Sequence, residues 1–331
     1  MKTQALPSQD LLKSIYGKYY LKEGDSQSKY VSSHWKLNYE KFNVQLDGEG
    51  NVQSLEGTGF GYVKIRDPLA KLLSYICYIS YLVKLSSRFD ILRLMVPSFR
   101  VCRAMQVFLS FDCFKQICSL ALIIKNMSIG MKKKRLVFLI VGDGYGFLSS
   151  LIKFVFPNST IVLVDIGKTL LFQAFYCQTV HPESVHKGVN EDFDIKTVDF
   201  LYCPCEYLEK LDMFKYDILI NIVSMQEMNY LTIKRYFCFF RKYCNTESLF
   251  YCCNRELKIL PAGEVSEFKK YPWEDRDEHL IDEYCPWCKY ALFYQQRQNV
   301  PRIFSVKGPF IHYFDEPIMH RLTVLSGLSE K

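Results

Sequence analysis

From residue 136 onward, short apolar runs rich in β-branched residues alternate with runs of amphipathic periodicity. The apolar runs predict strands at 136–141, 160–165, 198–203, 216–223 and 248–254, and the periodic runs predict helices at 146–156, 167–180 and 230–244. Near-continuous apolar strands that alternate with helices indicate a parallel sheet covered on both faces. Two further apolar runs, at 302–306 and 320–326, predict a last pair of strands. The pattern therefore predicts an α/β, Rossmann-like fold.

The first 130 residues have a different pattern. Residues 1–66 are polar and turn-rich, whereas 67–130 show apolar positions at three- and four-residue steps that predict helices. We therefore divide the chain into a polar and helical extension, 1–130, and a main domain, 131–331. Within that domain, a charged segment at about 255–300, rich in tryptophan and proline, reads as an insertion.

Two segments before the main domain are strongly apolar, at 69–83 and 107–124. A membrane-spanning helix needs about 20 predominantly apolar residues. The first segment is shorter than that, and the second carries Asp112 and Lys115 near its middle. We expect buried or amphipathic helices here and no transmembrane segment.

A glycine-rich loop, Gly142-Asp143-Gly144-Tyr145-Gly146, follows the first predicted strand. In an open parallel sheet, ligands bind outside the carboxyl ends of the strands, and glycines let the backbone approach them closely. A dinucleotide site has the spacing G-x-G-x-x-G, but here the third glycine comes one residue early. The spacing therefore favours S-adenosyl-L-methionine over a nicotinamide dinucleotide, and an NAD-dependent oxidoreductase remains an alternative.

Polar residues also follow the second and fourth predicted strands. Asp165 ends the second strand, where its carboxylate can accept bonds from both ribose hydroxyls of an adenosine; the alternative is a cap of the next helix. Asn221, Ser224, Gln226 and Glu227 lie at or just past the end of the fourth strand. An acceptor would meet a transferred methyl group at this position.

At this level of detail the sequence resembles the sugar O-methyltransferases, S-adenosylmethionine-dependent enzymes of the class I methyltransferase fold. The resemblance rests on blocks of sequence at 141–148, 164–178, 214–228, 249–256, 271–287 and 315–326. It implies a mostly parallel seven-stranded sheet with helices on both faces, S-adenosyl-L-methionine as cofactor and a sugar or glycan hydroxyl as acceptor.

The resemblance also assigns roles to particular residues. Cofactor binding falls to Gly142, Asp143, Gly144, Gly146, Asp165, Cys203 and Asn221, with Cys203 beside the adenine, and Gln226 and Glu227 face the acceptor. The family often has an acidic residue two positions before the first glycine, where this chain has Ile140. Asp143 is a candidate substitute, and a catalytically degenerate binding protein on the same fold remains a second alternative.

Methyl transfer to a hydroxyl requires an in-line approach of the oxygen and removal of its proton. The candidate bases are Glu227, Asp275, Asp277, His279 and His320, of which we select Glu227 and His320. Trp273, Asp275 and His279 would bind the sugar, because aromatic faces pack against sugar C–H surfaces. The segment 255–300 would then be a lid over the acceptor; the alternative is a small satellite core.

Composition limits the remaining classes. Lysine and arginine exceed the acidic residues by 42 to 35, a mild excess without a concentrated basic groove, so we expect no nucleic-acid partner. Thirteen cysteines and no signal peptide indicate a reduced, cytoplasmic protein. Cys285-Pro-Trp-Cys288 has no second C-x-x-C pair, and Cys252-Cys253 is not one, so we expect no metal. The oligomeric state is left open.

Overall fold

The computed structural model describes residues 7–21, 31–57, 76, 91–288, 290–292, 302–303, 306–307, 311–313 and 317–328. Apart from Ile76, the apolar segment 69–83 lies outside these residues. Within the described ranges, none of the helices has both the length and the apolar character needed to cross a membrane.

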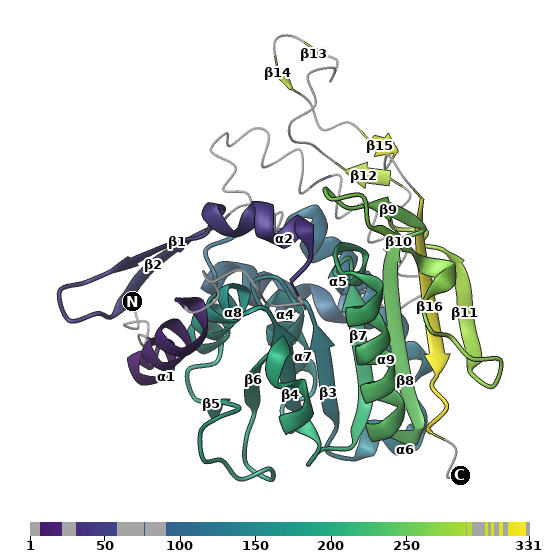
Figure 1. Ribbon diagram of the computed structural model, residues 1–331, viewed down its shortest axis with the longest axis horizontal. Helices are drawn as coiled ribbons and strands as arrows, with labels where there is room; N and C mark the ends of the chain where they lie inside the picture. The colour runs from purple at the N-terminus through teal and green to yellow at the C-terminus, as the bar shows by residue number, and fades with distance from the viewer. Residues whose placement is uncertain are drawn as a thin grey trace.

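One large sheet organises the described chain (Figure 1). Its strands are β3 (Val137–Val141), β4 (Thr160–Asp165), β5 (His186–Gly188), β6 (Phe200–Pro204), β7 (Tyr216–Ile222), β8 (Cys244–Arg255), β11 (Glu278–Tyr284) and β16 (Ile318–Val324). The order across the sheet is β11-β16-β8-β7-β3-β4-β6-β5. Strands β3 to β8 pair in parallel, whereas β16 runs antiparallel to both β8 and β11. The predicted α/β, Rossmann-like fold is confirmed.

Helices cover both faces of this sheet, which explains the continuous apolar strands. On β3, Phe138 and Ile140 join one core cluster while Leu139 and Val141 join the other. The first cluster takes in α4 (Leu92–Ala104), α5 (Phe111–Asn126), α7 (Phe147–Val155) and α8 (Gly167–Val180), and the second takes in α9 (Tyr230–Tyr243). Because successive side chains of a strand point to opposite faces, a strand between two helical layers has no polar side.

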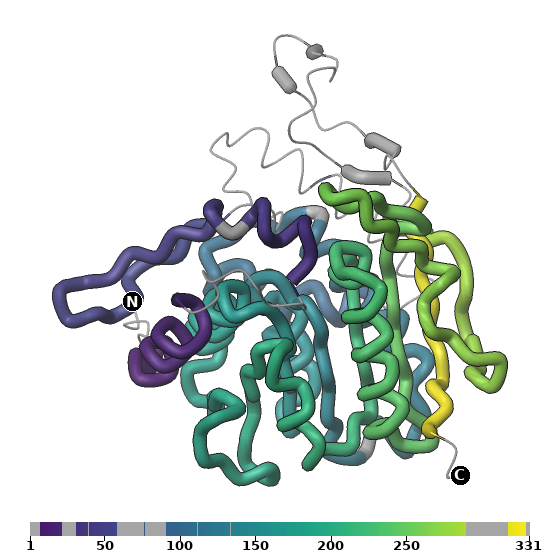
Figure 2. Tube along the Cα trace, viewed as in Figure 1, coloured from purple at the N-terminus to yellow at the C-terminus, as the bar shows by residue number. Residues whose placement is uncertain are grey.

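The N-terminal elements pack onto the same body. They are α1 (Gln9–Ile15), η1 (Tyr16–Tyr20), α2 (Ser33–Asn38), η3 (Tyr39–Lys41), β1 (Asn43–Leu46) and β2 (Val52–Glu56). Leu12 and Phe42 belong to the first core cluster, and the Phe42 ring meets Phe172 of α8 at 5.4 Å between centroids. Figure 2 shows this purple part of the chain against α8, at the opposite side of the sheet from the yellow strand β16.

The remaining elements are short. They are α6 (Ile129–Lys133), η4 (Cys205–Leu211), η5 (Met225–Glu227), β9 (Leu257–Ile259), β10 (Val265–Glu267), η6 (Phe268–Lys270), β12 (Tyr290–Leu292), β13 (Arg302–Ile303), β14 (Val306–Lys307) and β15 (Ile311–Tyr313). The predicted strand at 302–306 corresponds to β13 and the start of β14, which pair with each other and not with the large sheet.

The segment 255–300 differs from the predicted insertion. Its residues 278–284 form β11, the edge strand of the large sheet, which pairs antiparallel with β16. The sequence pattern missed β11 because its exposed edge position leaves it polar, with the sequence Glu-His-Leu-Ile-Asp-Glu-Tyr. This part of the segment is therefore framework, not lid.

Candidate active site

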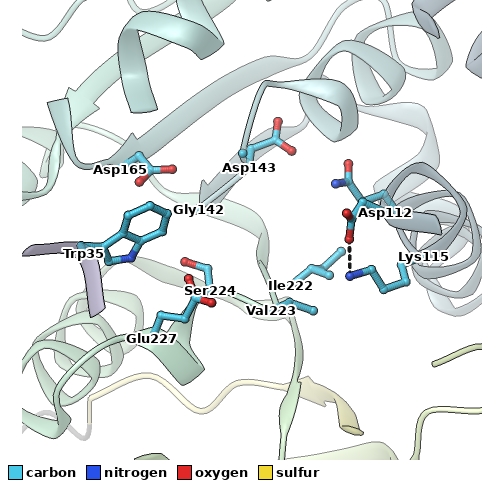
Figure 3. Close-up of a pocket in the computed structure, with 12 residues that line it drawn as sticks. Trp35, Asp112, Lys115, Gly142, Asp143, Asp165, Ile222, Val223, Ser224 and Glu227 are labelled. Atoms are coloured by element: carbon cyan, nitrogen blue, oxygen red, sulfur yellow. Dashed lines mark ion pairs between the residues drawn. The ribbon is translucent and has the colours of Figure 1, made fainter. Parts of the chain in front are cut away.

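A cleft opens at the carboxyl ends of β3, β4 and β7 (Figure 3). It holds about 650 Å³ of non-protein space, part of its open mouth included. Its lining consists of Trp35, Asp112, Lys115, Gln116, Gly142, Asp143, Gly144, Asp165, Ile222, Val223, Ser224 and Glu227. In an open α/β sheet this is the edge where ligands bind, at the place where neighbouring strands connect in opposite directions.

The glycine loop needs its glycines for two reasons. Gly142, Gly144 and Gly146 have φ angles of 77°, 60° and 85°, in the left-handed region that favours glycine. A Cβ at Gly142 would also lie 2.0 Å from Ser224 Oγ, and one at Gly146 would lie 2.6 Å from Cys177 Sγ. Gly142 therefore brings the backbones after β3 and β7 together, while Gly146 sits behind the cleft at the start of α7.

Asp143 turns back into the loop. Its two carboxylate oxygens accept hydrogen bonds from the backbone N–H groups of Leu148 (3.2 Å) and Ser149 (2.9 Å) in the first turn of α7. Burial raises the pKa of Asp143 to about 7, although these bonds partly oppose the shift. Asp143 lines the cleft, and the role that its bonds establish is to cap α7.

Asp165 lies on the neighbouring strand, at the end of β4. Its Oδ1 accepts a bond from the Ile166 N–H (2.8 Å), and its Oδ2 accepts one from Gln173 Nε2 (2.8 Å). The side chain is half-buried and faces the cleft. Helix α8 starts at Gly167 with Ile166 as its N-cap residue, so Asp165 lies one residue before the cap and bonds to the N–H of that residue.

Asn221 and Gln226, at the end of β7, do not line the cleft. Asn221 is fully buried: its Nδ2 donates to Val141 O (2.8 Å), and its Oδ1 accepts from the Met225 N–H (3.0 Å). Gln226 is buried as well, and its Oε1 accepts from the Arg255 N–H (2.8 Å). We predicted that Asn221 contacts the cofactor and that Gln226 contacts the acceptor, but neither side chain lines the cleft. Both instead bind backbone groups and fix the turn after β7.

The turn itself has an unusual backbone. Val223 has a φ of 59°, which is rare for a β-branched residue. Its N–H donates to the carbonyl of Cys253 on β8 (2.7 Å), and the residue lines the cleft. Strained backbone of this kind occurs mainly at functional sites and persists where the surrounding bonds over-determine it.

Glu227 follows this turn and faces the cleft. Lys258 Nζ lies 2.8 Å from its Oε1, and His34 Nε2 lies 3.5 Å from its Oε2. Burial lowers the pKa of His34 below its usual value, although Glu227 opposes the shift. The lowered pKa favours the neutral form of the His34 imidazole beside the carboxylate.

Four lining residues come from segments that the sequence interpretation did not assign to a site. Trp35 lies on α2, and Asp112, Lys115 and Gln116 lie on α5. Figure 3 shows Trp35 beside Asp165 on one side of the cleft and the Asp112–Lys115 pair, 2.5 Å apart, on the other. A charged pair three residues apart in an apolar run was the signal that could have found them.

The environment of the α5 side chains fits a polar ligand. Burial is the largest effect on the pKa of Lys115 and lowers it, but the charge and hydrogen bond of Asp112 together with the nearby Cys288 and Cys253 raise it, and the net shift is upward. Gln116 Oε1 is buried without a hydrogen-bond partner among the described residues. A buried acceptor without a partner carries a desolvation cost, which a donor group of a bound ligand would remove.

Two further predicted site residues lie away from the cleft. Cys203 is fully buried in β6, with its thiol donating to the Pro204 carbonyl at 3.3 Å. His320 is fully buried on β16, where its Nδ1 lies 3.2 Å from Tyr251 Oη and its ring meets Trp287 edge-on. Neither residue lines the cleft. The structure therefore does not support the predicted contact of Cys203 with the adenine or the predicted catalytic role of His320.

The predicted acceptor residues, Trp273, Asp275 and His279, also lie elsewhere. Strand register shows this: His279 pairs with Thr323, which pairs with Phe250 in the middle of β8. The cleft lies further along the sheet, where Ile222, one of its lining residues, pairs with Cys253. Trp273 packs against Phe250, with 5.5 Å between ring centroids, and Asp275 is exposed. These three residues therefore do not cover the cleft, and Trp273 packs against the second of the two main core clusters, so a separate satellite core does not describe it either.

The motif Cys285-Pro-Trp-Cys288 has a neighbour that sequence spacing did not reveal. The Sγ atoms of Cys253, Cys285 and Cys288 all lie within 4.8 Å of one another. The expectation of no metal assumed that the motif stands alone, and this assumption is wrong.

Neither a family model nor a curated protein matches the sequence. Among solved structures, TehB from Haemophilus influenzae matches with 10% identity over 58% of each chain and a TM-score of 0.39. Phospholethanolamine N-methyltransferase 2 from Haemonchus contortus, solved with S-adenosylhomocysteine, matches with 17% identity over 42% of this chain and 28% of that chain (TM-score 0.30). The PH0226 protein from Pyrococcus horikoshii OT3 matches with 16% identity over 64% of this chain and 90% of that chain (TM-score 0.38). Because the sequence identities and TM-scores are this low, the substrates and cofactors of these proteins cannot be assigned to this chain from the likeness.

Proposed function

We propose that the protein is an S-adenosyl-L-methionine-dependent O-methyltransferase. The observation that carries this proposal is the pairing of Gly142 with Ser224 across the cleft, beside Asp165 on the next strand. Left-handed glycines after the central strand and a carboxylate after its neighbour form a nucleoside site at the ligand-binding edge of the sheet. The early third glycine favours a cofactor without a pyrophosphate.

The side chains of the cleft fit this cofactor. Asp165 faces the cleft with its carboxylate held by the Ile166 N–H and by Gln173 Nε2, and the hydroxyls of a ribose are donors of the kind that a carboxylate accepts. Gln116 Oε1 offers an acceptor for the amino group of the methionine part, in place of the acidic residue that Ile140 replaces. Ile140 itself is buried in the core and cannot serve. When bound, S-adenosyl-L-methionine supplies an activated methyl group on a sulfonium.

Glu227 is the proposed proton acceptor. Its Oε2, the oxygen that is not bonded to Lys258, would accept the proton of the acceptor hydroxyl. Lys258 and Ser32 fix the residue, because Lys258 binds the carboxylate and the Ser32 hydroxyl donates to the Glu227 carbonyl. A fixed carboxylate at the mouth of the cleft can orient the acceptor as well as accept its proton.

A sugar or glycan acceptor rests on the family resemblance, because Trp273, Asp275 and His279 lie away from the cleft. Trp35 supports the same class of acceptor from another part of the chain. Its indole lines the cleft near Glu227 and offers an aromatic face to sugar C–H groups, while the carboxylate accepts hydroxyl bonds.

Calorimetry tests the cofactor. We expect S-adenosylhomocysteine to bind, and Asp165→Ala to weaken binding at least about 10-fold, equivalent to about 1.4 kcal/mol. The exposed Asp212, outside the cleft, supplies the matched control Asp212→Ala, which should bind as the unmodified chain does. Tighter binding of NAD would favour the oxidoreductase alternative. Binding of S-adenosylhomocysteine without methylation of any hydroxyl acceptor would favour the degenerate binding protein.

A further inference from the structure

Three buried thiols converge beside the cleft. Cys253 lies near the end of β8, and Cys285 and Cys288 lie in the turn that follows β11. The Cys285 N–H donates to the Ile318 carbonyl of β16 (2.8 Å), and the Cys288 N–H donates to the Cys285 carbonyl (3.2 Å). These bonds close the turn and hold it against β16, so that both of its sulfurs meet Cys253.

Buried free cysteines are common as small apolar residues, and most of those in this chain have that role. Cys252 and Cys253 show how a cysteine of the thiol cluster differs from an ordinary buried cysteine. They are adjacent on β8 and equally buried, but they belong to opposite core clusters because successive side chains of a strand point to opposite faces. Cys252 has Asn254 Nδ2 beside its sulfur, whereas Cys253 has two thiols.

We propose that Cys253, Cys285 and Cys288 bind a structural zinc ion through their sulfur atoms. A zinc–thiolate bond is about 2.3 Å long, so the sulfurs of a tetrahedral site lie about 3.8 Å apart. The present separations, all within 4.8 Å, reach this spacing through small side-chain rotations. Zinc binding displaces the thiol protons to solvent and leaves three thiolate–metal bonds.

A fourth ligand completes a tetrahedral zinc site. His320 pairs with Cys253 across the β8–β16 ladder, so both side chains point to the same face of the sheet. Its ring lies against Trp287, the residue between the two cysteines of the turn, with 5.0 Å between ring centroids. A Cys₃His set, in which the imidazole nitrogen reaches the metal by side-chain rotation, is a common structural zinc site.

The surrounding charges suit such a site. Three thiolates and one zinc ion leave a net charge of −1, which is costly to bury without a compensating cation. Lys115, a buried ammonium on α5, interacts electrostatically with Cys253 and Cys288.

The metal would stabilise the wall of the cleft. The carbonyl of Cys253, one of the proposed ligands, accepts the N–H of Val223, whose strained backbone lines the cleft. A zinc ion at this position therefore joins β8, β16 and the turn after β11, and supports the turn after β7 through that hydrogen bond. This role is independent of the proposed methyl transfer.

Metal analysis and cobalt spectroscopy test the proposal. The chain purified under reducing conditions should contain about one zinc ion per molecule. After chelation, cobalt(II) should give a thiolate-to-metal charge-transfer band and the visible bands of a tetrahedral site, both abolished by added zinc. Cys253→Ser and Cys288→Ser should remove the charge-transfer band or weaken cobalt binding at least about 10-fold. Cys252→Ser, the matched control, should keep both.

Two results would overturn the proposal. One is a folded, fully reduced wild-type chain that contains no zinc and gives no cobalt charge-transfer band. This measurement needs no variant, so it decides the question even if a serine substitution prevents folding. The other is loss of metal in Cys252→Ser equal to the loss in Cys253→Ser, with circular dichroism showing that both variants are folded.

Discussion

Two regions of the large sheet differ in what their polar and aromatic residues do. At the carboxyl ends of β3, β4 and β7, Gly142, Asp165 and Glu227 face an open cleft. Beside the middle of β8, Trp273 packs against Phe250, Phe237 and the guanidinium of Arg321, which lies 4.6 Å from its ring. Both groups combine residues that suit ligand binding, but only the first lines this cleft.

The difference teaches that residue type is a weaker guide than position along a strand. In a parallel sheet the loop after each strand emerges at the same edge, so chain order alone places Gly142 and Asp165 together. In contrast, β16 runs antiparallel to β8, and its register carries His279 of β11 to the level of Phe250. The reversed strand thus places these candidate residues beside the middle of β8, and not at the carboxyl ends where the cleft lies.

The largest effect on ligand binding is expected from Gly142→Ala. The substitution imposes a side chain at a φ of 77° and places a Cβ 2.0 Å from Ser224 Oγ, so the two walls of the cleft must separate. We expect S-adenosylhomocysteine binding to weaken at least about 100-fold, equivalent to about 2.7 kcal/mol, in calorimetry.

Gly263→Ala is the control for backbone strain. Gly263 has a similar φ of 90°, but a Cβ there would have nothing within 4 Å. This variant should lose stability without losing ligand affinity. The double variant Gly142→Ala, Ser224→Gly should recover part of the binding because it removes the atoms that collide. Equal losses in Gly142→Ala and Gly263→Ala would show that the contact between the loops is unimportant.

The fold and one side of the site were predictable because their signals are local. Apolar runs such as 136–141 identify buried parallel strands, since both faces of β3 contact helices. The glycine spacing identifies the loop, and the end of the second strand identifies Asp165. Each inference needs only the residues of one segment and the rule that ligands bind at the carboxyl edge.

The rest depended on contacts between distant segments. Trp35 and Lys115 enter the cleft from α2 and α5. The charged pair Asp112–Lys115 distinguishes α5 within its apolar run, but neither sequence indicates which strand ends the helix meets. Cys253 joins Cys285 and Cys288 through the pairing of β8, β16 and β11, and β11 escaped prediction because an exposed edge strand lacks an apolar pattern. Asn221 and Gln226 have the residue types of ligand contacts but instead satisfy buried backbone groups.

The titration of Asp143, which lines the cleft, should change the stability of the fold, an effect smaller than that of Gly142→Ala on ligand binding. Its pKa of about 7 in the folded chain exceeds the usual value of 3.8, so the folded state binds the proton more tightly than the unfolded state. Stability should therefore fall as pH rises from about 4 to about 7, by on the order of 2–4 kcal/mol from this group.

Urea unfolding across this pH range measures how the free energy of unfolding changes with pH in the wild type and in each variant. Asp143→Asn cannot titrate, so its stability should fall less than that of the wild type as pH rises. The exposed control Asp212→Asn should keep the wild-type slope. An Asp143→Asn variant with an unchanged slope would show that the carboxylate is charged throughout the range, and therefore that the cleft end is better solvated than its burial indicates.

The smallest effect on ligand binding is expected from Trp273→Ala. The indole packs against Phe237 and Phe250 and lies under Arg321, and its Nε1 donates to the Phe268 carbonyl at 3.3 Å. Its loss should lower the free energy of unfolding by roughly 2–4 kcal/mol, through lost packing and the lost cation–π contact. The affinity for S-adenosylhomocysteine should change less than about 2-fold, since less than about 0.4 kcal/mol of binding energy is at stake.

Trp35→Ala supplies the matched comparison, because it removes the same side chain from the lining of the cleft. It should weaken binding of the ligand or the acceptor more than Trp273→Ala does, while costing less stability, because Trp35 borders open space. Calorimetry and urea unfolding on the two variants measure both quantities. If Trp273→Ala weakened ligand binding as much as Trp35→Ala in a folded chain, the region around Trp273 would contribute to the site after all. The contrast between the two regions would then have to be abandoned, and acceptor binding sought in both.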